Sequence, residues 1–135
     1  MTAAGLSSAS VDRARRELEE RGLYAELSVG DMRTCDRKGG GFDVVISADN
    51  AVPHLLLDQE ILCAFQAMHR SLRPGGIALI TVWDYTVEDR STPQFRPYGL
   101  RSIPGGRCVV YQIWDFQADH YDEALYFVWE RAGRS

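Results

Sequence analysis

The stretch that decides the fold is Phe42–Asn50, FDVVISADN, together with Ser71–Tyr85, SLRPGGIALITVWDY. Phe42–Ala48 is almost continuously apolar, which is typical of a strand covered on both faces of a parallel sheet. The second stretch holds a Pro-Gly-Gly turn followed by another apolar strand, Ile77–Trp83. Because a helical pattern separates the two strands, we expect a parallel strand–helix–strand crossover.

The helix of this crossover is predicted from its ends and from its apolar spacing. Asp58 is the expected N-cap, since a carboxylate accepts hydrogen bonds from the free N–H groups of the first turn. The sequence Arg73–Gly76, RPGG, is expected to end the helix. The predicted buried stripe consists of Ile61, Leu62, Phe65, Met68 and Leu72.

The residues before this unit predict one more helix and one more strand. Ser7–Gly22 is expected to be a helix, with Ser8 or Ser10 as its cap and Gly22 as a left-handed terminator. Tyr24–Val29 is expected to be a short strand, and the charged, glycine-rich Arg33–Gly41 a loop. The buried stripe of the first helix is predicted to be Val11, Ala14 and Leu18.

The last third of the chain has a different character. Thr86–Gly106 is rich in proline and poor in apolar residues, so we expect a long irregular segment. Cys108–Phe116 and Ala124–Glu130 are rich in Val, Tyr, Phe and Trp, which predicts an antiparallel hairpin. The expected fold class is therefore α/β, with parallel strands, crossover helices and a C-terminal antiparallel hairpin, in a single domain spanning residues 1–135.

Composition limits the classes of function. A chain of 135 residues with a formal charge of −4 lacks the clustered basic charge of a nucleic-acid-binding surface. No apolar stretch is long enough for a membrane helix, and no signal-peptide pattern opens the chain. The three cysteines form no CxxC motif, so we expect free thiols in a cytoplasmic protein and no metal site.

Two polar residues end the first deciding stretch. Asp49 and Asn50 follow its apolar strand. In open α/β sheets, ligands bind at the carboxyl ends of the strands, which makes these two side chains candidates for a binding site. The alternative is an ordinary loop in which they bond to nearby backbone groups.

Several motifs in order resemble one family. Ser28–Met32 (SVGDM), Phe42–Asn50, Leu72–Gly76 (LRPGG) and the closing hairpin resemble the class I S-adenosylmethionine-dependent methyltransferases. Among these, the chain is most similar to the glycine/sarcosine type of N-methyltransferase, because Asp49–Leu55 (DNAVPHL) matches an Asn-x-x-x-His-Leu stretch of those enzymes. The resemblance implies a Rossmann-like fold, S-adenosylmethionine as cofactor, and methyl transfer to a small amine or amino acid.

The resemblance also implies a cofactor site. The Asp31 carboxylate would accept the adenine amine and the Met32 N–H would donate to a ring nitrogen, although Gly30-Asp31 is equally typical of a plain turn. Asp49 and Asn50 would face the sulfonium and the substrate amine, because a carboxylate suits a nearby cation. His54 would orient the substrate or accept a proton, and the alternative is that it only fixes the loop and the following helix start.

Two further residues lie where the family places substrate contacts, after the fifth strand. These are Tyr85 and Arg96. The guanidinium of Arg96 could hold a substrate carboxylate through two parallel hydrogen bonds. The alternative is a solvated loop arginine.

The chain departs from the family pattern at its beginning. We find no glycine-rich cofactor loop, and Gly5 occupies the position of the acidic residue that binds the ribose hydroxyls. With the family's first strands missing, Phe42–Ala48 becomes an exposed apolar edge, which predicts a homo-oligomer or a partner chain that supplies strands. The alternatives are a catalytically inactive remnant that acts as an oligomerising or partner-binding module, and a misassigned start.

Overall fold

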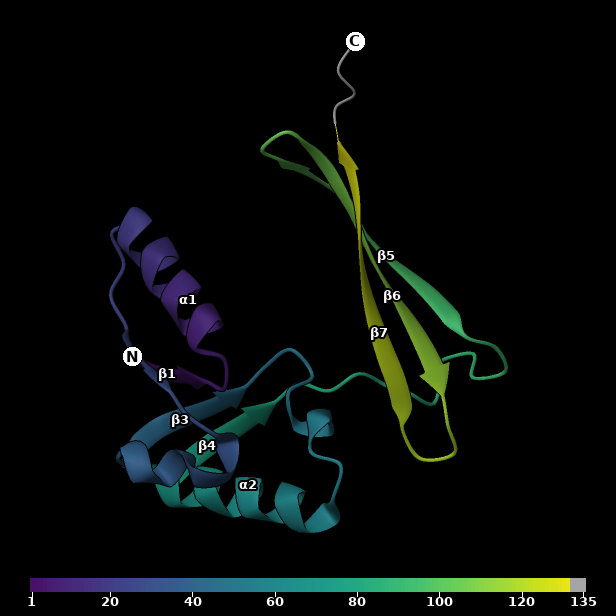
Figure 1. Ribbon diagram of the computed structural model, residues 1–135. Coiled ribbons are helices and arrows are strands. Elements are labelled where there is room, and N and C mark those ends of the chain that lie inside the picture. Colours follow the sequence, from purple (N-terminus) through teal and green to yellow (C-terminus); the bar gives the residue numbers. More distant parts are fainter. Residues whose placement is uncertain (132–135) are drawn as a thin grey trace. The chain divides into compact units, whose positions relative to one another are not determined.

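The computed structural model describes residues 1–131, apart from the side chains of residues 37 and 38. The chain divides into two compact units, residues 1–83 (unit 1) and the residues from 84 onward (unit 2) (Figure 1). The single-domain prediction stays a prediction. Unit 1 contains the parallel strands and both α-helices, and unit 2 contains antiparallel strands. The predicted α/β class is confirmed.

The first crossover of unit 1 runs β1, α1, β2. Strand β1 (Thr2–Gly5) pairs in parallel with β2 (Glu26–Val29), and α1 (Ser8–Glu20) connects them. The N-cap is Ser7, one residue before the predicted Ser8, because its hydroxyl accepts the N–H of Ser10 at 3.3 Å. The predicted helix end is confirmed, with Gly22 in the left-handed conformation at φ 64°. Val11 is buried and Leu18 half-buried, whereas the predicted Ala14 is exposed.

The second crossover of unit 1 is the one predicted from the deciding stretch. Strand β3 (Phe42–Ser47) pairs in parallel with β4 (Leu72–Ile80), and α2 (Asp58–Ser71) connects them. The N-cap residue of α2 is Leu57, whose side chain makes no capping hydrogen bond. The prediction that Asp58 caps the helix is therefore wrong. Asp58 instead lies in the first turn, where a negative charge is favourable.

Two short 3₁₀ helices follow the strands of unit 1. Residues Met32–Lys38 form η1 after β2, where a loop was expected, because the Asp31 side chain caps its first turn by accepting the N–H of Arg33. Residues Val52–His54 form η2 after β3. Both segments therefore lie directly beyond the carboxyl ends of parallel strands.

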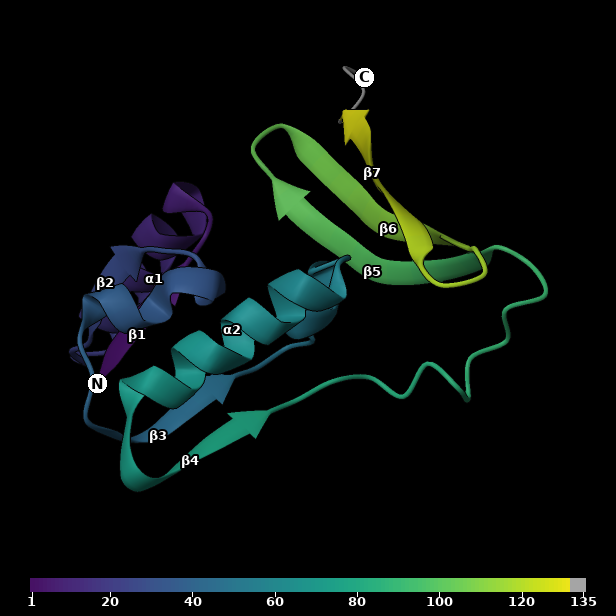
Figure 2. The ribbon, with the colours of Figure 1, turned by 90° about the horizontal axis from the view of Figure 1, so that it is seen from below.

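The core of unit 1 lies between α2 and the β3–β4 pair (Figure 2). Ala64 and Ala67 have no exposed surface and Met68 is buried, while Leu62 and Phe65 are 48% and 43% exposed. The predicted stripe is thus correct at Met68 and wrong at Leu62 and Phe65. The small alanines let the helix approach the strands, and this turns the bulkier residues away from the core. Other residues packed into this core are Met32, Cys35, Val45, Val52, Leu55, Ile61 and Ile80.

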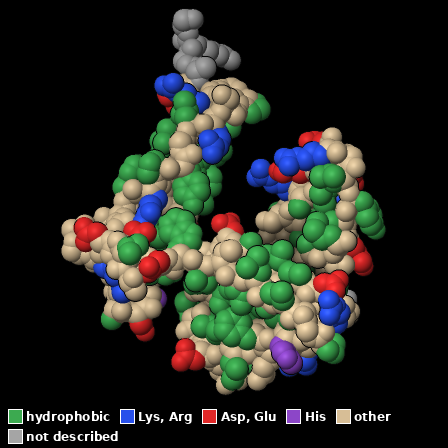
Figure 3. All heavy atoms as spheres, turned by 180° about the vertical axis from the view of Figure 1, so that it is seen from behind, with side chains coloured by type: hydrophobic (Ala, Val, Ile, Leu, Met, Phe, Trp, Pro, Cys, Tyr) green, Lys and Arg blue, Asp and Glu red, His purple; other side chains and the backbone are tan. Residues whose placement is uncertain are grey.

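The opposite face of the β3–β4 pair is apolar and exposed. It carries Val44, Ile46, Ile77 and Leu79, which we call the apolar face, and each is between 49% and 64% exposed. The register places Val44 beside Ile77 and Ile46 beside Leu79. Figure 3 shows hydrophobic side chains gathered over unit 1 on this side. The strands therefore have the two-sided apolar character of a parallel sheet, with α2 on one side only.

Unit 2 is a three-stranded antiparallel sheet with the order β5–β6–β7. Strands β6 (Gly106–Phe116) and β7 (Tyr121–Arg131) form the predicted hairpin. Strand β5 (Gln94–Ile103) lies inside the segment expected to be irregular, so that expectation is wrong. Proline is tolerated in a strand at the edge of a sheet, and Pro97 lies in just such an edge strand.

Among the described residues, no helix is both long and apolar enough to cross a membrane.

Candidate functional site

The loop after β3 holds the clearest sign of a functional site in unit 1. Asp49 and Asn50 both have left-handed backbone conformations, with φ of 58° and 59°. Residues other than glycine adopt this conformation at a cost of about 1–2 kcal/mol, which is smaller for Asp and Asn, and they usually do so singly. Two adjacent residues of this kind store strain at the carboxyl end of the strand, and such strain is typical of functional sites.

Hydrogen bonds with Thr81 and Trp83, two residues that follow β4, hold this strained turn. The backbone N–H of Asp49 donates to the Thr81 hydroxyl at 3.0 Å, and the N–H of Trp83 donates to the Asn50 side-chain oxygen at 3.0 Å. The N–H of Thr81 also donates to the carbonyl of Ser47 at 3.0 Å, which continues the pairing of the two strands. Asn50 is buried by this arrangement, whereas Asp49 is exposed. The turn therefore presents the Asp49 carboxylate to solvent at the strand ends.

Replacing Thr81 with valine is expected to release the Asp49 backbone. The valine keeps the shape of threonine but cannot accept the Asp49 N–H, so we expect a loss of about 1 kcal/mol in unfolding free energy. The amide resonance of Asp49 should shift in the NMR spectrum at the same time. Thr81→Ser keeps the hydroxyl and should preserve that resonance. An unchanged Asp49 resonance in Thr81→Val would show that other contacts hold the turn.

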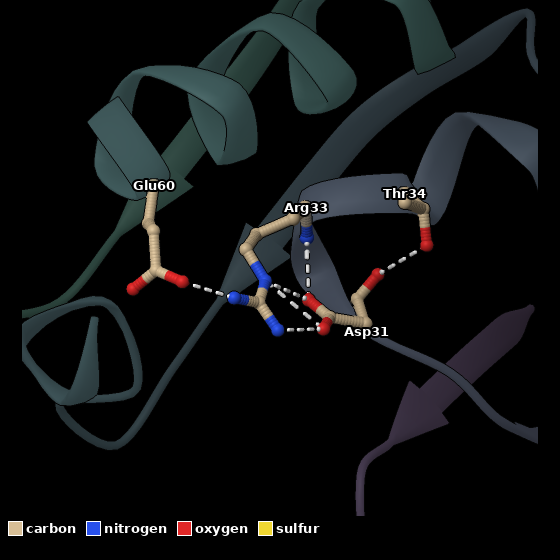
Figure 4. A network of polar contacts seen from close by, with 4 residues as sticks. All are labelled: Asp31, Arg33, Thr34 and Glu60. Carbon is tan, nitrogen blue, oxygen red and sulfur yellow. Dashed lines mark hydrogen bonds and ion pairs between the residues drawn. The ribbon is translucent and has the colours of Figure 1, made fainter. Parts of the chain in front are cut away.

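Asp31 belongs to a network of charged groups at the end of β2 (Figure 4). Its carboxylate accepts the Arg33 backbone N–H at 2.8 Å and also binds the Arg33 guanidinium, with an Nη2 to Oδ2 distance of 2.5 Å. Arg33 continues the network to Glu60 on α2. The Arg33 side chain, and next its backbone N–H, hold the pKa of Asp31 below its ordinary value. Asp31 is therefore ionised at neutral pH and tied to η1 and α2.

Replacing Asp31 with asparagine is expected to cause a pH-dependent loss of stability. The amide oxygen can still cap η1, but the charge pair with Arg33 is lost. Because the folded-state pKa of Asp31 is lowered, its contribution is present above the unfolded pKa and disappears as pH falls through the folded pKa. The urea midpoints of Asp31→Asn and the original chain should therefore differ modestly at neutral pH and converge in acid. A difference that persists in acid would contradict this account.

Core packing links the remaining predicted residues of unit 1. Met32 packs against the cluster that contains Val52, so η1 and η2 share the same core. Met32 is half-buried, and His54, the last residue of η2, is exposed. The structure thus joins the two loops that carry Asp31, Met32, Asp49, Asn50 and His54 through a common apolar contact.

The two predicted substrate residues, Tyr85 and Arg96, lie in unit 2 and join one aromatic cluster. The Tyr85 and Tyr121 hydroxyls are 3.4 Å apart, and Tyr121 stacks on Trp114 with ring centroids 4.5 Å apart. The Arg96 guanidinium lies over the other ring of this stack, 4.5 Å from the centre of Trp114. Arg96 also binds Glu88, with a nitrogen to oxygen distance of 2.5 Å. Burial, and next the Tyr85 hydroxyl, raise the pKa of Tyr121 above its ordinary value.

Sequence reasoning missed several residues of these sites. Thr81 is 32 positions from Asp49, and no local pattern signals their contact. Trp114 was expected only as a strand residue, and Tyr121 was expected outside both strands of the hairpin; their stacking depends on the hairpin register. Gly5 ends β1 beside Val29 and offers no carboxylate, as the sequence indicates. Within residues 1–131, no three side chains of the metal-binding types come together.

Comparison with protein families supports a family assignment. A model described as a methyltransferase domain matches residues 1–76, which is more than half of the chain. A comparison with curated protein sequences found no match.

Comparison with solved structures gives relatives of low sequence identity and similar fold. An S-adenosylmethionine-dependent methyltransferase from Clostridium acetobutylicum is 15% identical with a TM-score of 0.65, and the match covers 98% of this chain and 58% of that protein. CalS10, an amino pentose methyltransferase from Micromonospora echinaspora, is 24% identical with a TM-score of 0.65 and coverage of 95% and 57%. The sugar N-methyltransferase KedS8 from Streptoalloteichus is 18% identical with a TM-score of 0.61 and coverage of 96% and 56%.

These relatives establish the fold. This chain spans less than three fifths of the length of each of them.

Proposed function

This chain belongs to the methyltransferase domain family, and from that premise we propose that it takes part in methyl transfer from S-adenosylmethionine to the nitrogen of a small amine or amino acid. Support for the cofactor comes from the family and from the fold relatives, one of which is described as bound to S-adenosylmethionine. Support for an amine acceptor comes from relatives described as an amino pentose methyltransferase and a sugar N-methyltransferase. The glycine/sarcosine type remains our proposal for the subclass.

The observation that carries the proposal is the strained turn of Asp49 and Asn50. It lies at the carboxyl end of β3, the place where α/β sheets bind ligands. An exposed carboxylate there suits the positive sulfonium of the cofactor. Asp31 would accept the adenine amine by giving up a contact with Arg33, because Arg33 makes four contacts with a carboxylate that has about four acceptor sites. The residues therefore fit the two ends of the cofactor, whereas Gly5 cannot bind the ribose hydroxyls.

The chemistry asked of this site is alignment more than acid–base catalysis. When bound, S-adenosylmethionine supplies an electrophilic methyl group on a positively charged sulfur. The chain's own residues have to hold an acceptor nitrogen in line with that methyl group, and such positioning is a major source of rate enhancement. We assign Asp49 and Asn50 to the reacting end, His54 to substrate orientation or proton acceptance, and Tyr85 and Arg96 to substrate contacts.

Calorimetric titration of the purified chain with S-adenosylmethionine and S-adenosylhomocysteine tests this proposal. Saturable binding that weakens in Asp49→Asn is the expected result, most strongly for the positively charged ligand. Asp43→Asn is the control, because Asp43 is an exposed aspartate near the start of β3, at the end opposite to the turn that carries Asp49. Absence of binding to a chain whose fold is verified by circular dichroism would overturn the proposal.

We also propose that the free edge of β3 pairs with a strand from a second polypeptide. Strands β1 and β3 belong to separate two-stranded sheets, and among the described strands β3 hydrogen-bonds only to β4. The exposed apolar face on the same strands is a second reason to expect a partner. A chain that sediments as a monomer at high concentration and binds cofactor in that state would contradict this part of the proposal.

The second candidate function is a catalytically inactive module that binds other chains. Gly5 at the expected ribose-binding position favours it. The calorimetric titration separates the two candidates, because this module would be folded and would associate without binding either ligand.

A further inference from the structure

The outer edge of β7 is the most exposed apolar strand edge among the described residues of unit 2. Five consecutive large apolar residues, Leu125–Trp129, are each between 44% and 63% exposed. The sheet order β5–β6–β7 leaves the other side of β7 without a described strand (Figure 1). Its pairing with β6 runs without a register shift from Tyr121 to Arg131. A long, flat, apolar edge of this kind is a template for pairing with another strand.

The two edges of this sheet differ in a way that singles out β7. The opposite edge strand, β5, contains Pro97, and its register shifts between Pro97 and Gly99. Prolines and bulges are the features that keep edge strands from pairing with other chains. β7 has neither feature. The sheet is therefore protected at one edge and open to pairing at the other.

We propose that β7 pairs antiparallel with β7 of a second copy of this chain, and that the two sheets continue as one. A twofold axis perpendicular to the sheet keeps every side chain on its own face. Along β7, one face carries Glu123, Leu125, Phe127, Trp129 and Arg131, and the other carries Asp122, Ala124, Tyr126, Val128 and Glu130.

Charge selects one register for this pairing. With Phe127 opposite the partner's Phe127, Glu123 lies opposite the partner's Arg131, and symmetry makes two such ion pairs. A shift that centres Tyr126 puts Asp122 opposite the partner's Glu130, which repels twice. A shift that centres Val128 places the partner's Arg131 opposite Leu125, so both Glu123–Arg131 ion pairs are lost. The register centred on Phe127 also places Leu125 beside the partner's Trp129 and so covers the exposed apolar residues.

Charge reversal tests this arrangement in the full chain. Sedimentation over a concentration series should show a dimer, and Glu123→Arg or Arg131→Glu should each weaken it by about tenfold or more, because each places two like-charge pairs across the interface. The double variant restores opposite charges and should restore dimerisation. Arg101→Glu, an exposed charge reversal on β5, is the matched control and should dimerise like the original chain.

Several results would overturn the proposal. One is a monomer at all concentrations, and another is single variants that are folded by circular dichroism yet dimerise unchanged. A third is a folded double variant that fails to recover dimerisation.

Hydrogen exchange adds a further check, because β7 amides should be more protected in the dimer than in the monomer. Full protection in the monomer would mean that another part of the same chain covers the edge. Association through β3 would be unaffected by these charge reversals and is distinguished in this way.

Discussion

Replacing Met68 with alanine should destabilise unit 1 by about 3 kcal/mol, since truncating a buried methionine removes its apolar contacts and leaves a cavity. Met68 is 3% exposed and lies in the cluster with Val52 and Ala64. This loss is a large fraction of the stability of a typical domain. Because Val52 lies only two residues after Asn50, the cavity should also loosen the Asp49 and Asn50 backbone.

Helical circular dichroism during urea denaturation measures this effect, since both described α-helices belong to unit 1. Met68→Leu is the matched control, because a swap of similar volume usually costs less than about 1.5 kcal/mol. Leu62→Ala is a second control on the same helix, where the side chain is 48% exposed. Equal losses of unfolding free energy in Met68→Ala and Leu62→Ala would contradict the observed orientation of α2, in which Met68 faces the core and Leu62 faces outward.

Replacing Gly106 with alanine should disrupt unit 2 with a similar cost of about 3 kcal/mol. A Cβ at this position would overlap the backbone carbonyl oxygen of Glu130 on the neighbouring strand. The end of β7 would have to move away from β6, and the ion pair between Arg107 and Glu130 would be strained with it.

Fluorescence in a Trp83→Phe background measures this second effect, because the two remaining tryptophans, Trp114 and Trp129, both lie in unit 2. Gly105→Ala is the matched control. Gly105 has φ of 80° and open space around its Cβ position, so alanine there should cost only about 1–2 kcal/mol of backbone strain. A loss for Gly106→Ala no larger than for Gly105→Ala would show that the strands absorb the added methyl group easily.

The crossover from β3 to β4 could be predicted because its signals are local. An apolar run, a helical repeat and a Pro-Gly-Gly turn follow one another within about forty residues. The phase of α2 could not be predicted from apolar spacing, because its apolar residues occupy more than one side of the helix. Ala64 and Ala67 decide the phase by allowing close approach to the strands, and hydrophobicity alone does not rank them above Leu62 or Phe65.

Strand β5 was missed for a related reason. Proline argues against a strand in the middle of a sheet, but whether a strand lies at an edge is a property of the whole sheet. In the candidate site, too, some features follow from the local sequence and others depend on how the strands pair. The place of Asp49 and Asn50 after a strand follows from sequence, while the bond from Asp49 to Thr81 depends on the register of two paired strands.

The apolar face of β3 and β4 has a calorimetric consequence. The heat capacity of unfolding rises with the apolar surface that unfolding newly exposes to water. Val44, Ile46, Ile77 and Leu79 are already about half hydrated in the folded chain, so they contribute only part of their usual increment. The stability of the chain should therefore change with temperature along a flatter curve than its length suggests. A partner that covers this face would make that curve steeper.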